Sequence, residues 1–305
     1  LVVANDTVRN FLYLGKGDGT FKEEGRSSGI AFDTNGNARG AMGIDIGRFR
    51  NSDELGIAIG NFANETTALY VRRTLTNQLP VFQDEAISNG IAPPTRPELT
   101  FGVFFFDSDL DGRLDIFAAN GHLEKDINLV QSSQHYEQPP QLLWNCGAEH
   151  ENEFVALESA QCGEDFVRRM VGRGASFADI DGDGDLDLLI TSNGGSPRLL
   201  RNDQDLGHHW LRVRLTGTTG VNSSAIGTWI DIHTATGVRS QQVMPTRSYL
   251  SQAELPVTFG LGDHDQIDKL VIRWPNGTTR EVKNPEIDTM LEFTQAVPTA
   301  TSKGQ

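Results

Sequence analysis

Two acidic stretches decide how this chain is interpreted: Asp107-Ser-Asp-Leu-Asp-Gly-Arg-Leu-Asp115 and Asp179-Ile-Asp-Gly-Asp-Gly-Asp-Leu-Asp187. Both read D-x-D-x-D-G-x-x-D, and both run directly into an apolar stretch. Carboxylates at every second position of a tight turn can converge on one hard cation, and calcium accepts about six to eight oxygen ligands at such a site. The glycine at the sixth position permits the sharp bend. The two stretches therefore predict two calcium sites.

Each loop offers side-chain carboxylates and one backbone carbonyl as calcium ligands. In the first loop the carboxylates are joined by the carbonyl of Arg113, and they belong to Asp107, Asp109, Asp111 and Asp115. In the second loop they are joined by the carbonyl of Asp185, and they belong to Asp179, Asp181, Asp183 and Asp187.

An EF-hand is the rival interpretation, because its ligand series begins in the same way. It requires a bidentate Glu at the twelfth position and flanking helices. Ala118 and Ile190 occupy that position here, inside short apolar runs that end in turn signals. A solvated acidic turn that binds no ion is the other alternative, and two matched copies in one chain argue against it. The sequence therefore favours calcium sites at both loops.

Composition excludes some functions and favours a β-rich protein. The formal net charge is −15 and the isoelectric point about 4.8, which disfavours nucleic acid or an anionic membrane surface as partner. The 32 glycines suit a turn-rich β protein. No apolar run approaches the roughly 18 residues of a membrane span. No charged-then-apolar leader opens the sequence, so we expect any signal peptide to lie outside it.

The chain contains two cysteines, Cys146 and Cys162. Their spacing fits neither a CxxC redox pair nor a zinc knuckle. In a secreted protein they would form one disulfide that closes a long loop, which stabilises the fold by up to ~3 kcal/mol. Two unrelated free thiols are the alternative.

Short strands recur along the first two thirds of the chain. One strand type ends in Asn at intervals of 56, 59 and 73 residues, and its copies are Leu1–Asn5, Gly56–Asn61, Ile116–Asn120 and Leu188–Asn193. A second short strand follows each copy, and a third precedes all but the first. Short strands at such a period, with polar turns between them, predict the blades of a β-propeller. Because the array starts in mid-blade, we expect a partial or truncated propeller of about three to four blades.

One copy of the loop has lost its metal chemistry. The stretch Arg48-Phe-Arg-Asn-Ser-Asp-Glu-Leu-Gly56 places Arg48, Arg50 and Gly56 where the other loops carry aspartates. Guanidinium groups cannot ligate calcium, but they can bridge the acids and carbonyls that an ion would otherwise gather. We therefore predict that this loop binds no metal.

The repeats resemble the FG-GAP or VCBS repeats of integrin α-type β-propellers, a resemblance that the acidic loops and Phe101-Gly102 carry. The segments that follow resemble the ASPIC/UnbV domain, which typically comes after such repeats in secreted bacterial proteins and in the cartilage acidic protein family. That second resemblance rests on His209–Leu215, Ala225–Gly227, Ser248–Gln252, Phe259–Gly262 and Ile272–Gly277. It implies a secreted, all-β protein with extracellular or periplasmic localisation.

The pattern changes after the last acidic loop. Leu211, Val213 and Leu215 alternate with arginines, which indicates a strand with one buried face. Further strands are expected up to Phe293, with a hairpin turn at Pro275-Asn-Gly277. We predict propeller blades over residues 1–207, a small antiparallel β-sandwich or barrel over 208–296, and a flexible tail over 297–305.

No catalytic constellation emerges from the sequence. It holds no G-x-S-x-G elbow, no H-E-x-x-H and no Walker-type lysine. His122 follows an Asn-Gly turn, where it could line a cleft together with Asn120, although packing is the simpler role. His208 and His209 lie near the boundary between the expected domains, where packing is again the simpler role.

We therefore expect a non-enzymatic scaffold, adhesion or recognition module, stabilised by calcium at two sites. Its partner would be a protein or polysaccharide ligand at the cell surface. Two alternatives stay open at this point. One is a carbohydrate-binding or carbohydrate-processing enzyme that uses a cleft on the propeller face. The other is a subunit of an extracellular surface assembly, paired through the open edge of the propeller.

Overall fold

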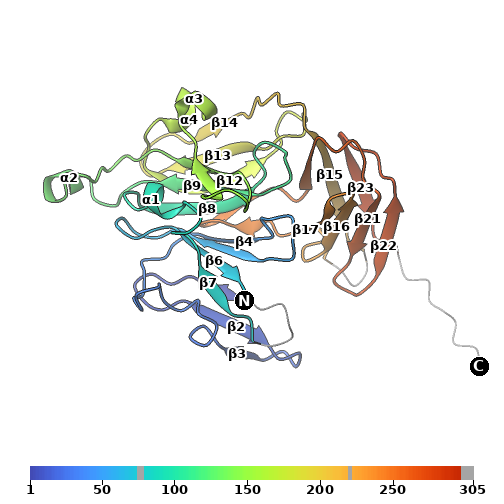
Figure 1. The fold of residues 1–305 in the computed structure, drawn as a ribbon, viewed down its shortest axis with the longest axis horizontal. Coiled ribbons are helices and arrows are strands. Elements are labelled where there is room, and N and C mark those ends of the chain that lie inside the picture. The colour runs from blue at the N-terminus through green and yellow to red at the C-terminus, as the bar shows by residue number, and fades with distance from the viewer. Residues whose placement is uncertain (74–78, 219–221, 297–305) are drawn as a thin grey trace, which may run out of the picture. The chain divides into compact units, whose positions relative to one another are not determined.

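The computed structural model describes residues 1–73, 79–218 and 222–296. These residues form two compact units, and each is described by itself. The first comprises Leu1–Ser108, Arg113–Gln204 and Thr246–Ala253, and the second comprises Asp109–Gly112, Asp205–Pro245 and the residues from Glu254 onward. The regular secondary structure of both units is almost entirely strand (Figure 1), which confirms the predicted all-β class. The predicted flexible tail lies outside the described residues.

The first unit contains four successive sheets among the described residues, and each is an antiparallel meander of strands that follow one another in the chain. The first sheet is β1 (Val2–Val3), β2 (Phe11–Gly15) and β3 (Phe21–Glu23). The second is β4 (Ile44–Gly47), β5 (Gly56–Ile59), β6 (Ala68–Arg72) and β7 (Phe82–Asp84). The third is β8 (Thr100–Phe106), β9 (Asp115–Asn120), β10 (Gln141–Asn145) and β11 (Phe154–Ala156). The fourth is β12 (Gly172–Ala178), β13 (Asp187–Ser192) and β14 (Arg198–Leu200). This is the repeating blade that the sequence period predicts.

Within the described part of this unit, four single-turn helices lie in the connections. They are α1 (Ala92–Thr95), α2 (Ile127–Val130), α3 (Ser159–Cys162) and α4 (Glu164–Val167). Each spans only four residues, and the core receives single side chains from them, such as Ala92 of α1 and Phe166 of α4.

Apolar side chains pack between consecutive sheets of the first unit. Strand β8 shows why: its alternate residues Val103 and Phe105 join one buried cluster, while Phe104 and Phe106 join another. Successive side chains of a strand point to opposite faces, so a strand that is apolar at every position is buried on both. The third sheet is therefore covered on both faces, by residues of the second sheet on one side and of the fourth on the other.

The first unit also includes a short hairpin from late in the sequence, β18 (Thr246–Arg247) and β19 (Ser251–Gln252). The guanidinium of Arg247 lies 3.2 Å from the carboxylate of Asp45 in β4, and Tyr249 packs edge-on against Phe101 in β8. Ser176 of β12 donates a 2.7 Å hydrogen bond to the Gln252 carbonyl. The hairpin thus contacts the first strand of three sheets, which the predicted division at residue 207 did not foresee.

The second unit is a sandwich of two sheets around one core. One sheet has the order β20 (Val257–Gly262), β15 (His209–Thr216), β23 (Thr289–Thr294). The other has the order β17 (Gly237–Gln242), β16 (Trp229–Thr234), β21 (Lys269–Arg273), β22 (Thr279–Lys283). Leu211, Ile230 and Ile272 belong to the shared core. The predicted hairpin at Pro275–Gly277 joins β21 to β22, with Trp274 N–H bonded to the Thr278 carbonyl at 2.9 Å.

One pairing in the second unit differs from the antiparallel prediction. Strands β15 and β23 are parallel, with Leu211 opposite Thr289 and Phe293 opposite Leu215. After β22 the chain leaves one sheet and enters the other beside β15, and it runs in the same direction as that strand. Alternating hydrophobicity marks which face of a strand is buried, but it carries no information about the direction of its neighbour.

Candidate metal sites

The second acidic loop joins β12 to β13 and gathers three carboxylates. Oxygens of Asp179, Asp181 and Asp187 all lie within 4.8 Å of one another. Asp187 is 1% exposed and opens β13, whereas Asp181 lies at the surface. Gly182 and Gly184 have φ of 83° and 103°, a left-handed backbone that lets the loop turn sharply enough to bring these groups together. The cluster could hold a metal ion.

Asp187 is held in place by backbone hydrogen bonds. Its Oδ2 accepts the Ile180 N–H at 2.8 Å, and its Oδ1 accepts the Asn202 N–H at 2.8 Å. Burial raises the pKa of Asp187, while these two bonds act in the opposite direction. Asn202 follows β14, so one carboxylate ties the start of the loop and the end of the next strand to β13.

The side chain of Asp185, whose backbone carbonyl is the predicted ligand, lies buried in the second acidic loop. The side chain is only 4% exposed, inside the loop beside Asp183. Burial, followed by the hydrogen bond and charge of Asp183, raises the pKa of Asp185 to about 8. Burial and the neighbouring carboxylates thus disfavour the charged form of Asp185, and a bound cation would offset the repulsion among the carboxylates of this loop.

The first acidic loop joins β8 to β9 and gathers a slightly different set. Oxygens of Asp107, Asp109 and Asp111 lie within 4.8 Å of one another. The loop turns through the same kind of backbone as the second one, because Leu110 and Gly112 have φ of 60° and 92°. A leucine in this conformation is unusual, so the turn rather than the residue type determines the geometry at this position.

Asp115 repeats the role of Asp187 and lies outside the three-residue cluster of its loop. Its Oδ2 accepts the Ser108 N–H at 3.0 Å, and its Oδ1 accepts the Asn145 N–H at 2.7 Å. The Ser108 hydroxyl also donates to Oδ2, so only Oδ1 keeps a second lone pair that could face a metal. Arg113, predicted as a carbonyl ligand, directs its side chain away to donate to the Asn145 carbonyl at 2.9 Å.

The arginine loop joins β4 to β5 and follows a related backbone path. Asn51 at its fourth position has a positive φ of 49°. Leu110 and Gly182, at the same position of the acidic loops, have positive φ values as well. Its first arginine, Arg48, pairs with Asp53 inside the loop at 2.8 Å. The three loops therefore share a turn but differ in the charge that fills it.

Arg50 collects three carboxylates from separate parts of the first unit. Its Nε and Nη2 bind both oxygens of Glu153 at 2.7 and 2.5 Å, while Nη1 binds Glu54 at 3.1 Å and Nη2 binds Glu85 at 3.2 Å. Arg73 also pairs with Glu85 and Glu54. Glu153 and Glu85 are almost completely buried. The bridging of acids by an arginine, predicted from the sequence, is present here.

Gly56 at the ninth position shows why this loop has no counterpart of Asp115 or Asp187. A Cβ on Gly56 would lie 2.6 Å from Cδ1 of the Phe49 ring, which is fully buried in the core between two sheets. The aromatic ring occupies the space that a ninth-position side chain would need.

The predicted disulfide is not formed, since Cys146 and Cys162 are both free. The Cys146 thiol is buried and lies 3.1 Å from the Asn152 carbonyl, while the Cys162 thiol lies 3.1 Å from the Glu158 carbonyl in its own helix α3. Each sulfur thus has a local partner within its own loop. Burial raises the pKa of both thiols, which keeps them protonated.

His122 and Asn120 form no catalytic pair. His122 lies beyond the end of β9 that is remote from the acidic loop, is 3% exposed, and accepts the Glu124 N–H on Nδ1 at 3.0 Å. Burial lowers its pKa. Asn120 is fully buried and bonds to Thr100, Pro139 and Gln141.

His209 pairs with Asp288 at 2.7 Å, and the ring of His208 bonds to the Asp109 carbonyl.

Comparison with known proteins identifies the C-terminal region. Residues 217–300 match the ASPIC and UnbV family, the family to which the quoted segments carry a resemblance. Over 95% of its length the chain is also similar to cartilage acidic protein 1: 28% identical in Homo sapiens, 28% in Xenopus tropicalis and 27% in Mus musculus. It spans about two fifths of the length of these curated relatives, 41–42%.

Among solved structures, a GH32 beta-fructofuranosidase from Bombyx mori, in complex with sucrose, matches 94% of this chain and 73% of its own. The sequence identity is 10% and the TM-score 0.32. No helix in the described part of the chain is long and apolar enough to cross a membrane.

Proposed function

We propose that this chain is a non-catalytic recognition module, stabilised by calcium and acting outside the cytoplasm. The observation that carries the proposal is the convergence of Asp179, Asp181 and Asp187 within 4.8 Å, with Asp187 bound to the backbone just after the next strand. The first acidic loop gathers its own three carboxylates at the equivalent connection of the preceding sheet. Two such clusters at repeated positions support a structural rather than a catalytic metal.

The donor set supports calcium as the ion. All donors in the clusters are carboxylate oxygens, which hard cations prefer, and the loops offer neither the imidazole nor the thiolate that zinc favours. In the second loop Asp179, Asp181 and Asp187 would hold the ion; in the first, Asp107, Asp109 and Asp111 would. When bound, calcium supplies positive charge that offsets the repulsion within each loop.

The affinity expected of such loops supports an extracytoplasmic location. Extracellular calcium modules bind at roughly 0.1–1 mM. Millimolar calcium would then stabilise the fold by about 0.5–1.5 kcal/mol per site through mass action. Cytoplasmic calcium is far below that range, where the loops would carry uncompensated negative charge. The similarity to cartilage acidic protein 1 supports the same assignment.

Calorimetric titration with calcium tests the metal assignment. We expect two sites, of which Asp109→Ala removes the first and Asp181→Ala the second. Asp53→Ala, in the arginine loop, is the matched control and should leave both. If calcium releases no heat and melting temperatures are equal in calcium and in chelator, the proposal is wrong.

A further inference from the structure

A cavity of about 710 Å³ opens on the first unit, away from both acidic loops. It is lined by three connections: the one between β9 and β10 contributes Lys125 and Tyr136, and the one before β12 contributes Arg168 and Arg169. The connection between β13 and β14 contributes the turn from Ser192 to Pro197. This volume lies within the roughly 300–1,000 Å³ of ligand pockets.

The charge of the cavity is opposite to that of the chain. Four cationic side chains line it, namely Lys125, Arg168, Arg169 and Arg198, against the single carboxylate of Glu137. The whole chain carries a net charge of −15. Positive charge gathered in one concave place of an acidic protein attracts an anion.

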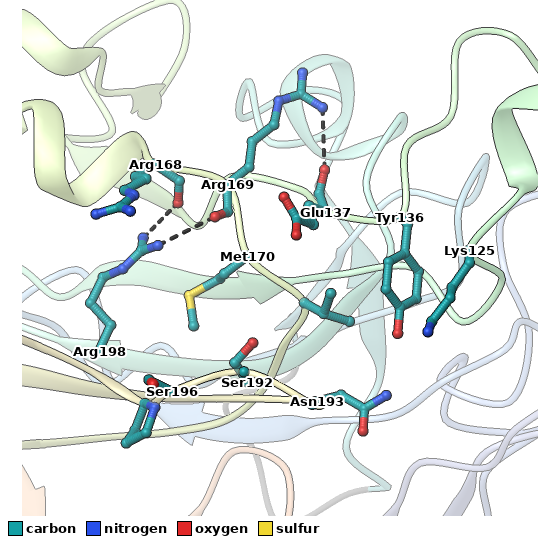
Figure 2. A pocket seen from close by; sticks show the side chains of 14 residues that line it. Lys125, Tyr136, Glu137, Arg168, Arg169, Met170, Ser192, Asn193, Ser196 and Arg198 are labelled. Atoms are coloured by element: carbon teal, nitrogen blue, oxygen red, sulfur yellow. Dashed lines mark hydrogen bonds between the residues drawn. The ribbon is translucent and has the colours of Figure 1, made fainter.

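Arg198 positions the two neighbouring arginines through their backbone, rather than contacting the ligand itself. Its guanidinium donates to the backbone carbonyls of Arg168 at 2.5 Å and Arg169 at 3.3 Å, as Figure 2 shows. Arg169 in turn donates to the Glu137 carbonyl at 3.2 Å and so joins two of the three connections. Burial, and then the positive charge of Arg168, lower the pKa of Arg198. Two like charges are therefore held close together by the fold.

The remaining lining is polar and carries one ring. Ser192, Asn193 and Ser196 offer hydroxyl and amide groups, and Tyr136 is half-buried with its ring beside Lys125 (Figure 2). The apolar side chains of Met170 and Val171 are buried and offer little contact to apolar peptide side chains. Hydroxyl and amide donors, a ring face and cations fit a sugar that carries acidic groups better than a peptide.

We propose that this cavity binds an acidic saccharide, one whose carboxylate or sulfate groups meet Lys125 and Arg168. Neither residue forms an ion pair within the described part of the chain, and both are exposed. The inference rests on the proposed recognition role and names its ligand class. It does not involve the metal loops, because β9 and β13 begin at those loops and end at the cavity, roughly 17–20 Å away for six extended residues.

The test is calorimetric titration of the full chain with four probes: a sulfated heparin-derived tetrasaccharide, a tetragalacturonate, a neutral tetrasaccharide and a hexa-aspartate peptide. We expect one or both acidic saccharides to bind, and to bind more weakly at high salt. Neither the neutral tetrasaccharide nor the peptide should bind. Arg168→Ala should weaken binding by about tenfold, the loss of one charge-assisted hydrogen bond. Lys125→Ala should weaken it by about threefold. Lys16→Ala, in an exposed turn of the first sheet, is the control and should have no effect.

Melting temperature and saccharide binding, measured on the same variants, distinguish the saccharide proposal from the proposed calcium sites. Arg168→Ala should keep the calcium-dependent rise in melting temperature, while Asp181→Ala should lose part of it and still bind the saccharide. The saccharide proposal is overturned by binding of the peptide at equal or higher affinity, by equal effects of Arg168→Ala and Lys16→Ala, or by no binding of either acidic saccharide.

Discussion

The loop before β5 and the loop before β13 form the same kind of turn but carry opposite charges. Both connect the first and second strands of a sheet, and both turn through a left-handed residue at the fourth position, Asn51 or Gly182. One gathers carboxylates that could hold an ion, while the other inserts the guanidinium of Arg50 among carboxylates. A turn that repeats along this chain therefore does not imply that a metal site repeats with it.

The two loops differ in how far apart in the chain their joined residues lie, and in whether the interaction depends on calcium concentration. A cation in the second loop would neutralise residues within nine positions of one another. Arg50 instead binds Glu153, 103 residues away in the chain, and Glu85 of the connection after β7. Because its charge is covalently attached, the arginine cluster works at any calcium concentration, and because the planar fork binds Glu153 through two nitrogens, lysine could not reproduce it.

The largest expected effect comes from removing the guanidinium. Arg50→Ala removes the ion pair of the nearly buried Glu153 and leaves Glu85 with Arg73 as its remaining cation. We therefore expect the free energy of unfolding to fall by about 3–5 kcal/mol. Arg50→Lys should recover only part of this loss. Arg48→Ala is the control, because its partner Asp53 is exposed and such pairs contribute ~0–1 kcal/mol. Urea unfolding measures all three, and an equal loss for Arg48→Ala and Arg50→Ala would contradict the comparison.

Asp115 tests whether the ninth position stabilises the fold without metal. Asp115→Ala removes the acceptors of the Ser108 and Asn145 N–H groups, and Asn145 is fully buried. We expect a loss of roughly 2–4 kcal/mol in chelator, because two backbone N–H groups and the Ser108 hydroxyl lose their acceptor. Asp109→Ala, at a partly exposed position of the same loop, should cost far less in chelator. If the two variants lose equal stability there, Asp115 is only a metal ligand.

Gly56 tests whether the arginine loop could regain the ninth carboxylate. Gly56→Asp should not create a calcium site, and it should lower the free energy of unfolding by about 1–3 kcal/mol because the new Cβ meets the Phe49 ring. Gly56→Ala separates packing from charge and should show most of the same loss. Calcium binding by Gly56→Asp, detected by calorimetry, would show that the ring gives way.

Calcium removal should have the smallest effect and should be confined to the acidic loops. At millimolar calcium the unfolding free energy should exceed its value in chelator by about 0.5–1.5 kcal/mol per site. Asp181→Ala should lose the contribution of its own loop and leave the other. A chemical denaturation series at several calcium concentrations measures this. The rise of the unfolding free energy with calcium concentration should be the same for Arg48→Ala and the unaltered chain.

Some features could be predicted because they are local. The acidic loops are contiguous, and turn geometry acts within a few residues, so the clustering of Asp107, Asp109 and Asp111 follows from their spacing. The strands followed from apolar runs between turn signals. Asp187 was predicted as a ligand in the same way, but its bonds to Ile180 and Asn202 were not, since Asn202 is brought close only by the pairing of β13 with β14.

Other features could not be predicted because they join distant parts of the chain. The cavity is formed by three connections that no shared motif marks, and its cations are scattered between residues 125 and 198. The free cysteines belong here as well: spacing permits a disulfide, whereas only packing decides that each thiol bonds within its own loop.

By itself, the sequence determined the blade period, the two acidic turns, the loss of aspartates in the arginine loop and the ASPIC/UnbV character of the C-terminal region. Only the tertiary structure decided which acids Arg50 gathers, that Thr246–Ala253 packs with the first unit, and that β23 runs parallel to β15. The reason is physical. Turn and strand preferences depend on neighbouring residues, whereas long-range partners depend on which buried faces meet when the sheets pack.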